Sequence, residues 1–195
     1  MKNFFSYDPK LLIYGFFIVF FASYGQTFFI SLFNTEIRFY YGLTDGEFGF
    51  VYAISTLFSS FVLISFAKLI DNIDLRAYSL IVTMGLLLAC VGMVIMFKNI
   101  FYLILIIFML RFFGQGAMTH AGVTTMARYF GQNRGKALSI ATLGGMTGVM
   151  FLPYIALNYF KNIHISQLWF YASISLIVFI PFIFLALSDQ KARHN

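Results

Sequence analysis

Charged side chains are scarce in this chain, and their scarcity limits what the protein can be. Asp, Glu, Lys and Arg make up 10% of its 195 residues, whereas hydrophobic residues make up 61%. A soluble domain typically carries about 25% charged residues, and one of this size cannot bury so much apolar surface. The composition therefore argues against a soluble domain and favours a protein that lies in a lipid bilayer.

Cysteine and acidic residues are also rare. Cys90 is the only cysteine, which excludes an internal disulfide and a thiolate metal cluster. The seven acidic residues lie at the termini, in loops or at helix ends, which leaves no carboxylate within the helices for proton coupling. We expect no metal site and no cofactor. The net charge of +6 is spread over short loops without a contiguous basic stripe, so we expect no nucleic-acid partner.

Six long apolar runs account for most of the sequence. Each has about the 20 residues that a helix needs to cross the hydrocarbon layer. Barrel strands would be about half as long and would alternate in polarity, which these runs do not. The sequence therefore predicts an all-α membrane protein in which residues 1–195 form one bundle of six transmembrane helices. We expect these helices at residues 11–33, 47–67, 77–97, 100–120, 136–158 and 167–187.

Lysine and arginine are distributed unequally between the two sides of these helices. Nine lie on the side of the two termini and three lie on the opposite side. Because loops rich in Lys and Arg stay in the cytoplasm, we expect both termini to be cytoplasmic. The remaining basic residue, Arg111, falls inside helix four. On the outer side, Thr44 and Glu47 have the spacing of a capping box that would start helix two.

Arg111 is the most informative residue because it lies close to the middle of the membrane. It is about 12 residues, or roughly 18 Å at 1.5 Å per residue, from the outer end of helix four. A charge at that depth faces a bundle interior or a wet cavity, where it contacts a substrate or ion or is held structurally by backbone carbonyls. Gln115 shares its face. Gln26 and Thr27 of helix one either line the same cavity or form interhelical hydrogen bonds, and we predict that all four residues bind substrate.

Small residues on helices two and five predict close helix packing. Helix two carries hydroxyl groups at helical spacing from Tyr52 to Ser60, and helix five carries small residues from Ser139 to Gly148, with a proline that predicts a kink or break. Helices three and six have few polar groups in mid-span and are expected to face lipid. The residues predicted for helix packing, or for a face toward a second bundle, are Ser55, Ser59, Thr142, Gly145, Gly148 and Pro153.

The loop between helices two and three resembles a signature of the major facilitator superfamily. That signature is Gly, three residues, then Asp-Arg-x-Gly-Arg-Arg, and the segment AKLIDNIDLR at residues 67–76 matches it in part. Asp71 takes the acidic position and Arg76 a basic one, whereas Ala67, Asn72 and Asp74 depart from the pattern. The resemblance implies that Asp71 and Arg76 help to hold the outward-facing state.

Further segments are similar to a bacterial branch of the superfamily akin to monocarboxylate porters. They are GQTFFISLF at residues 25–33, LRFFGQGAMTHA in helix four and ARYFGQNRGKALSIATLGG leading into helix five. Arg111, Arg134, Gly135 and Ala137 match the branch. The resemblance implies a cavity lined by helices one and four and a second bundle facing helices two and five. We place Arg134 with Asp71 and Arg76 in a conformational gate.

The resemblance covers one half of the usual two-bundle fold, and we expect the second bundle to be missing. It implies a multi-pass protein of the bacterial inner membrane that is not an enzyme. The expected function is secondary transport of a small solute such as an organic anion, by alternating access with a second half or a second copy of the chain. The alternatives are an inactive fragment, a non-transporting membrane adaptor, or, on the Asp71 and Asp74 pair, a membrane-embedded lipid enzyme.

The predicted orientation can be tested by labelling single cysteines in intact cells. In a background without Cys90, cysteines at Lys98 and Lys161 should react with an impermeant reagent from outside. Cysteines at Asn3 and His194 should react only after the membrane is opened. Labelling of the termini but not of Lys98 and Lys161 in intact cells would reverse the assignment.

Overall fold

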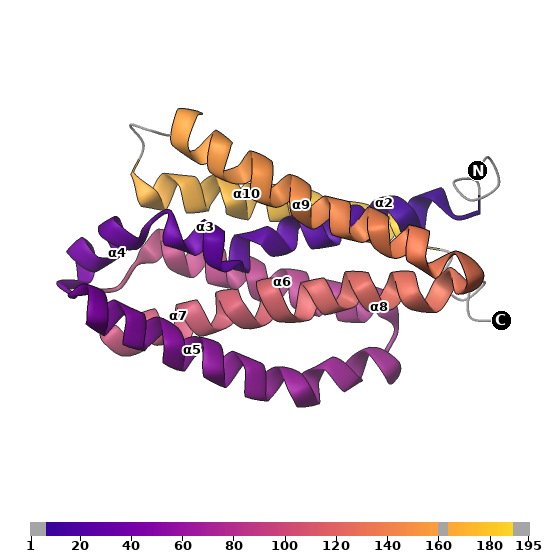
Figure 1. Ribbon diagram of the computed structural model, residues 1–195. Coiled ribbons are helices and arrows are strands. Elements are labelled where there is room, and N and C mark those ends of the chain that lie inside the picture. The colour runs from indigo at the N-terminus through magenta and orange to yellow at the C-terminus, as the bar shows by residue number, and fades with distance from the viewer. Residues whose placement is uncertain (1–6, 160–163, 189–195) are drawn as a thin grey trace.

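The computed structural model describes residues 7–159 and 164–188 as a bundle of long helices (Figure 1). The described residues contain six helical spans that are long and apolar enough to cross a membrane. This finding confirms the predicted all-α fold with six membrane helices. We number these spans helix one to helix six in chain order: Pro9–Ser31, Asp45–Asp71, Leu75–Ile95, Ile100–Tyr129, Gly131–Asn158 and Ile165–Ala186.

Several of these spans combine more than one element. The elements of helix one are α2 (Pro9–Phe21), the 3-10 turn η1 (Ala22–Gly25) and α3 (Thr27–Ser31). Those of helix two are α5 (Asp45–Phe66) and η2 (Ala67–Asp71). Those of helix four are α7 (Ile100–Met109), the π-helix η3 (Leu110–Met118) and α8 (Thr119–Tyr129). The remaining elements are α4 (Asn34–Tyr41), α6 (Leu75–Ile95), η4 (Gly131–Asn133), α9 (Arg134–Tyr159) and α10 (Ile165–Ala186).

Three helices differ in extent or continuity from the sequence expectation. Helix four continues to Tyr129, well past the expected end at residue 120. Hydropathy marks only the part of a helix that lies in hydrocarbon, and α8 carries many polar residues. Helix one is broken at Gln26, whose backbone is extended with φ −79° and ψ 152°. Pro153, expected to kink or break helix five, lies inside the continuous helix α9.

Capping residues satisfy free backbone groups at several helix ends. Thr44 and Glu47 form the predicted capping box, in which the Glu47 amide donates to Thr44 Oγ1 over 3.3 Å. Asn99 caps α7 by accepting from the Phe101 amide over 2.8 Å. Gly42 ends α4 in the left-handed conformation, with φ 70°, which glycine adopts without steric cost. These caps set the points where the chain turns back into the membrane.

Helix one is packed between its neighbours through glycine contacts. Figure 1 shows α9 running alongside α2, with α5 at the far edge of the bundle. A Cβ atom added to Gly144 of α9 would lie 2.0 Å from the Phe16 carbonyl oxygen, and one added to Gly148 would lie 2.1 Å from Ser23 Oγ. The backbones of helices one and five therefore approach each other as small residues allow in membrane proteins.

Helix three is the most buried of the six spans, which corrects the expectation that it lies at the periphery. Only one stripe of α6 faces outward, formed by Ile81, Met84, Leu88, Val91 and Ile95. The rest packs against neighbouring helices, including α10 and η3. The small number of polar groups in helix three did not show whether it faces lipid or other helices, because apolar side chains pack equally well against both.

The glycine contact between helices one and five predicts a steep cost for one added methyl group. Gly144→Ala should destabilise the fold by about 1–3 kcal/mol, the usual cost of overpacking. Gly49→Ala is the matched control, because a Cβ atom at this α5 position meets nothing within 4 Å. Thermal unfolding in detergent should show a lower melting temperature for Gly144→Ala alone. Equal melting temperatures would contradict the packing.

Candidate functional site

The interruptions of helices one and four lie directly against each other. A Cβ atom added to Gly25, the last residue of η1, would lie 2.0 Å from the Leu110 carbonyl oxygen. One added to Gly114 of the π-helix η3 would lie 2.6 Å from the Gly25 Cα atom. The two backbones therefore touch, and a side chain at either glycine would separate them. Breaks and π-helices of this kind free backbone groups and recur at functional sites.

Arg111 extends from η3 into this crossing and is only 7% exposed. Its Nη1 atom donates to the Gly25 carbonyl oxygen over 3.3 Å and to Thr27 Oγ1 over 3.0 Å. Its Nε atom donates to Thr56 Oγ1 over 3.2 Å. The guanidinium therefore joins helix four to both sides of the break in helix one and to helix two.

An aromatic ring covers the same cation. The Arg111 Cζ atom lies 5.3 Å from the centre of the Tyr52 ring, within the range of a cation–π interaction. The Tyr52 hydroxyl donates to Thr27 Oγ1 over 2.9 Å, so Thr27 accepts from both Tyr52 and Arg111. Tyr52 and Thr56 were expected only in a packing stripe, and the structure brings them into the site. Their helical spacing on helix two was the available signal.

No carboxylate among the described residues pairs with Arg111. All of its partners there are neutral hydroxyl or carbonyl oxygens and the face of a ring. A guanidinium has five N–H donors. Three of them, the one on Nε and the two on Nη1, are used by protein oxygens. Nη2 takes no part in these bonds to Thr56, Gly25 and Thr27, and the site keeps a net positive charge. It can therefore bind an anion.

The other two predicted substrate residues lie close to this crossing but do not bond to Arg111. The buried Oε1 atom of Gln115 has no hydrogen-bond partner within the described part of the chain. Its backbone lies at the Gly25 contact, because a Cβ atom on Gly25 would be 2.9 Å from the Gln115 nitrogen. Gln26 is half-buried and forms the break itself, and its carbonyl accepts from the Phe29 and Ile30 amides of α3. Thus Arg111 and Thr27 are in contact, whereas Gln26 and Gln115 border them.

The residues predicted for packing divide into two groups. Ser55 is buried and donates to the Ile104 carbonyl of helix four, and Ser59 is buried and donates to the Thr56 carbonyl. Gly145 and Gly148 face helix one inside the bundle. Thr142 is exposed on α9, and Pro153 is half-buried. Most of this set therefore packs within the bundle, and Thr142 lies on its outer surface.

The residues predicted for a gate lie at the opposite end of helix two from Thr44. Asp71 pairs with Arg128 at the end of helix four, and Arg128 also donates to the Ile70 carbonyl over 3.4 Å. Arg76 donates to the Leu187 carbonyl over 3.1 Å and lies 5.5 Å from the Phe184 ring centre. Arg134 is exposed at the start of α9, apart from these contacts. The sequence reading missed Arg128 because it placed this residue in a loop beyond helix four.

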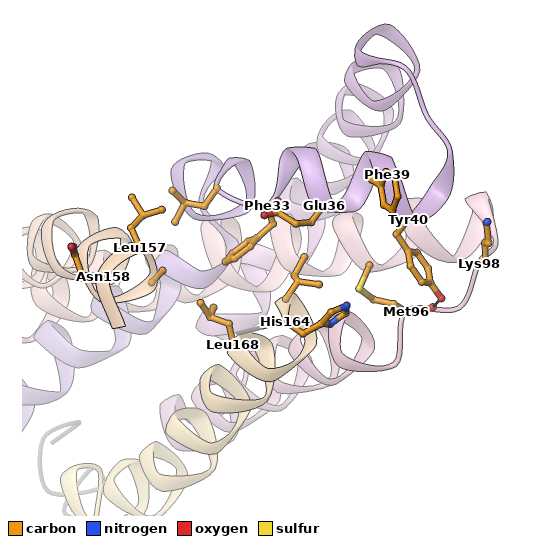
Figure 2. Close-up of a pocket in the computed structure, with 13 residues that line it drawn as sticks. Phe33, Glu36, Phe39, Tyr40, Met96, Lys98, Leu157, Asn158, His164 and Leu168 are labelled. Carbon is orange, nitrogen blue, oxygen red and sulfur yellow. Dashed lines mark hydrogen bonds between the residues drawn. The ribbon is translucent and has the colours of Figure 1, made fainter. Parts of the chain in front are cut away.

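A separate cavity of about 970 Å³ lies at the end of the bundle that carries α4. Figure 2 shows Phe33, Glu36 and Tyr40 on one side of it, and His164, the N-cap of α10, with Leu168 of α10 on the other. Met96 and Lys98 close a third side. None of Arg111, Thr27 and Gln115 lines this cavity, so it is distinct from the site at the helix crossing.

Comparison with known proteins identifies one family. The family model described as Major Facilitator Superfamily matches residues 15–195, which is nearly the whole chain. No curated protein and no solved structure matches the chain. The match includes the helix crossing, Arg111 and the loop that carries Asp71.

The ion pair between Asp71 and Arg128 predicts a small, salt-dependent contribution to stability. The two side chains are 61% and 35% exposed, and exposed pairs contribute about 0–1 kcal/mol. Asp71→Asn should therefore lower the melting temperature slightly at low salt. The difference should vanish at about 1 M salt, where charges are screened within about 3 Å. A double-mutant cycle with Arg128→Gln measures the coupling, and a large coupling that salt leaves unchanged would contradict the prediction.

Proposed function

We propose that this chain, which belongs to the major facilitator superfamily, carries a small organic anion across the membrane by alternating access. Members of this family are transporters and not enzymes. The proposal rests on one observation, which is that Arg111 is a buried cation without a carboxylate partner among the described residues. A bound anion would supply the missing negative charge.

Membrane energetics support a functional role for this cation. A charge at the centre of a membrane helix costs about 3 kcal/mol on insertion scales, and such residues mark substrate or ion pathways. Hydrogen bonds to a charged group contribute about 1.5–3 kcal/mol each. The three bonds from Arg111 therefore suffice to hold the cation in the bundle without neutralising it. We propose that Gln115, Gln26 and Thr27 contact the anion beside Arg111, and monocarboxylates are the first class to test.

Alternating access requires a second body that rocks against this bundle. Helices two and five are the least buried of the six spans, and their exposed surfaces include Phe61, at 64%, and Met150, at 70%. Thr142 lies on the same outer surface of helix five. We propose that this surface meets a second six-helix bundle, supplied by another half or by a second copy of the chain.

We propose a bacterial inner-membrane location in which both termini and the Asp71 loop lie in the cytoplasm. In that orientation the Asp71–Arg128 pair joins the loop after helix two to the end of helix four. The Arg76 bond to the Leu187 carbonyl joins the start of helix three to the end of helix six. These contacts support a gate that holds the outward-facing state, with the exposed Arg134 available to the opposing bundle.

Replacement of Arg111 tests the proposed function. Arg111→Lys keeps the charge but loses the planar fork of donors, so it should lower uptake of a monocarboxylate at least about tenfold, the effect of about 1.4 kcal/mol. Amounts of membrane-inserted protein should stay unchanged. Arg38→Lys is the matched control, because Arg38 pairs with Asp45 at the start of helix two and is not among the residues that bond to Arg111.

The measurement is uptake of radiolabelled acetate or lactate into cells or vesicles that contain this chain together with its second six-helix bundle. Arg111→Ala extends the series by removing the charge. Uptake at the wild-type rate in both Arg111 variants would overturn the assignment of Arg111 to the substrate site.

A further inference from the structure

A single nitrogen of Arg111 holds the two sides of the break in helix one together. Gly25 is the last residue of η1 and Thr27 is the first residue of α3, with the extended Gln26 between them. The Nη1 atom of Arg111 donates to the Gly25 carbonyl and to Thr27 Oγ1, over 3.3 and 3.0 Å. Helix four therefore bridges the point where helix one loses its own backbone hydrogen bonds.

The segment beyond the break depends on such contacts because it is short. α3 has five residues, too few for a helix to be stable by itself. Its amides at Phe29 and Ile30 bond back to the Gln26 carbonyl over 3.1 and 3.2 Å. Phe29 packs against Trp169 of helix six, with 5.3 Å between the ring centres. The Thr27 hydroxyl is the contact that ties α3 to Arg111.

The two bonds that Nη1 makes across the break compete with a carboxylate that binds Arg111 through Nη1 and Nη2. A bidentate carboxylate takes one N–H from each of two neighbouring nitrogens. The donor of Nε serves Thr56 and those of Nη1 serve Thr27 and Gly25, whereas Nη2 takes no part in these bonds. A carboxylate that binds Nη1 and Nη2 together must therefore displace Thr27 or the Gly25 carbonyl.

We propose that Thr27 is a positioning residue that couples anion binding to the outer part of helix one. The bond from Arg111 to Thr27 holds α3 against helix four in the empty site. A carboxylate bound by Nη1 and Nη2 takes over that donor and releases α3. This inference takes the bound anion from the proposed function, and its new claim is that anion binding releases α3. Because binding equilibria are reciprocal, loosening α3 also strengthens anion binding.

Hydrogen exchange of the amides at residues 27–33 measures the hold on α3 without any ligand. In the purified full chain in lipid nanodiscs, Thr27→Val removes the hydroxyl at constant shape. Exchange in this segment should rise about tenfold, the effect of losing one hydrogen bond to a charged group. Thr27→Ser keeps the hydroxyl and should retain wild-type protection. Thr147→Val is the matched control, because that hydroxyl bonds only within its own helix, to Leu143.

The fluorescence of Trp169, the only tryptophan in the chain and fully buried, reports the same segment from the opposite side. Its quenching by acrylamide should rise in Thr27→Val and stay unchanged in Thr27→Ser and Thr147→Val. Equal exchange and equal quenching in the wild type and in Thr27→Val would overturn the proposed hold on α3.

Sodium acetate, compared with sodium chloride at the same ionic strength, tests the release. Acetate should speed exchange at residues 27–33 in the wild type and have no further effect in Thr27→Val. If the protein takes up acetate in an Arg111-dependent way while α3 exchange stays unchanged, the coupling is refuted and the proposed function stands. If acetate is neither taken up nor able to change exchange, both the anion assignment and the release fail, while the Thr27 variants still decide the hold on α3.

Discussion

A guanidinium buried among six apolar helices must be surrounded by groups that can accept its hydrogen bonds, and the centre of this protein is built to meet that requirement. Arg111 reaches a freed carbonyl at Gly25, two threonine hydroxyls and the face of Tyr52. The carbonyl is available because helix one breaks at Gln26. The hydroxyls come from helices one and two, so the cation links three helices.

The close approach of these helices depends on glycine. Gly25 and Gly114 allow the backbone of helix one to rest on the π-helix of helix four, and Gly144 and Gly148 allow helix five to rest on helix one. In lipid, where apolar surfaces gain little from each other, such contacts supply the packing energy. The same contacts place Arg111 within reach of both sides of the break. The glycines that pack the helices therefore also position the buried cation.

The arrangement separates two kinds of polar group in the membrane. Buried hydroxyls such as Tyr14 and Ser79, 2.6 Å apart, join neighbouring helices and satisfy each other. Arg111 and the buried Gln115 Oε1 atom retain unused hydrogen-bonding capacity at the crossing. A satisfied pair stabilises a bundle, whereas unused donors and acceptors in hydrocarbon are costly unless a ligand or water meets them. This contrast is the physical reason to place a binding site at the crossing.

The sequence by itself determined the six membrane helices, the capping box at Thr44 and the burial of a charge at Arg111. Each of these follows from local properties, namely the length of an apolar run, the spacing of two side chains and the depth of one residue. The tertiary structure alone decided that helix one breaks at Gln26, that helix three is central, that Asp71 pairs with Arg128, and that Tyr52 and Thr56 join the site. These features depend on which backbones approach each other, and that choice is made by contacts between residues far apart in the chain. The helical spacing on helix two marked a shared face for Tyr52 and Thr56, but it did not show that this face meets Arg111.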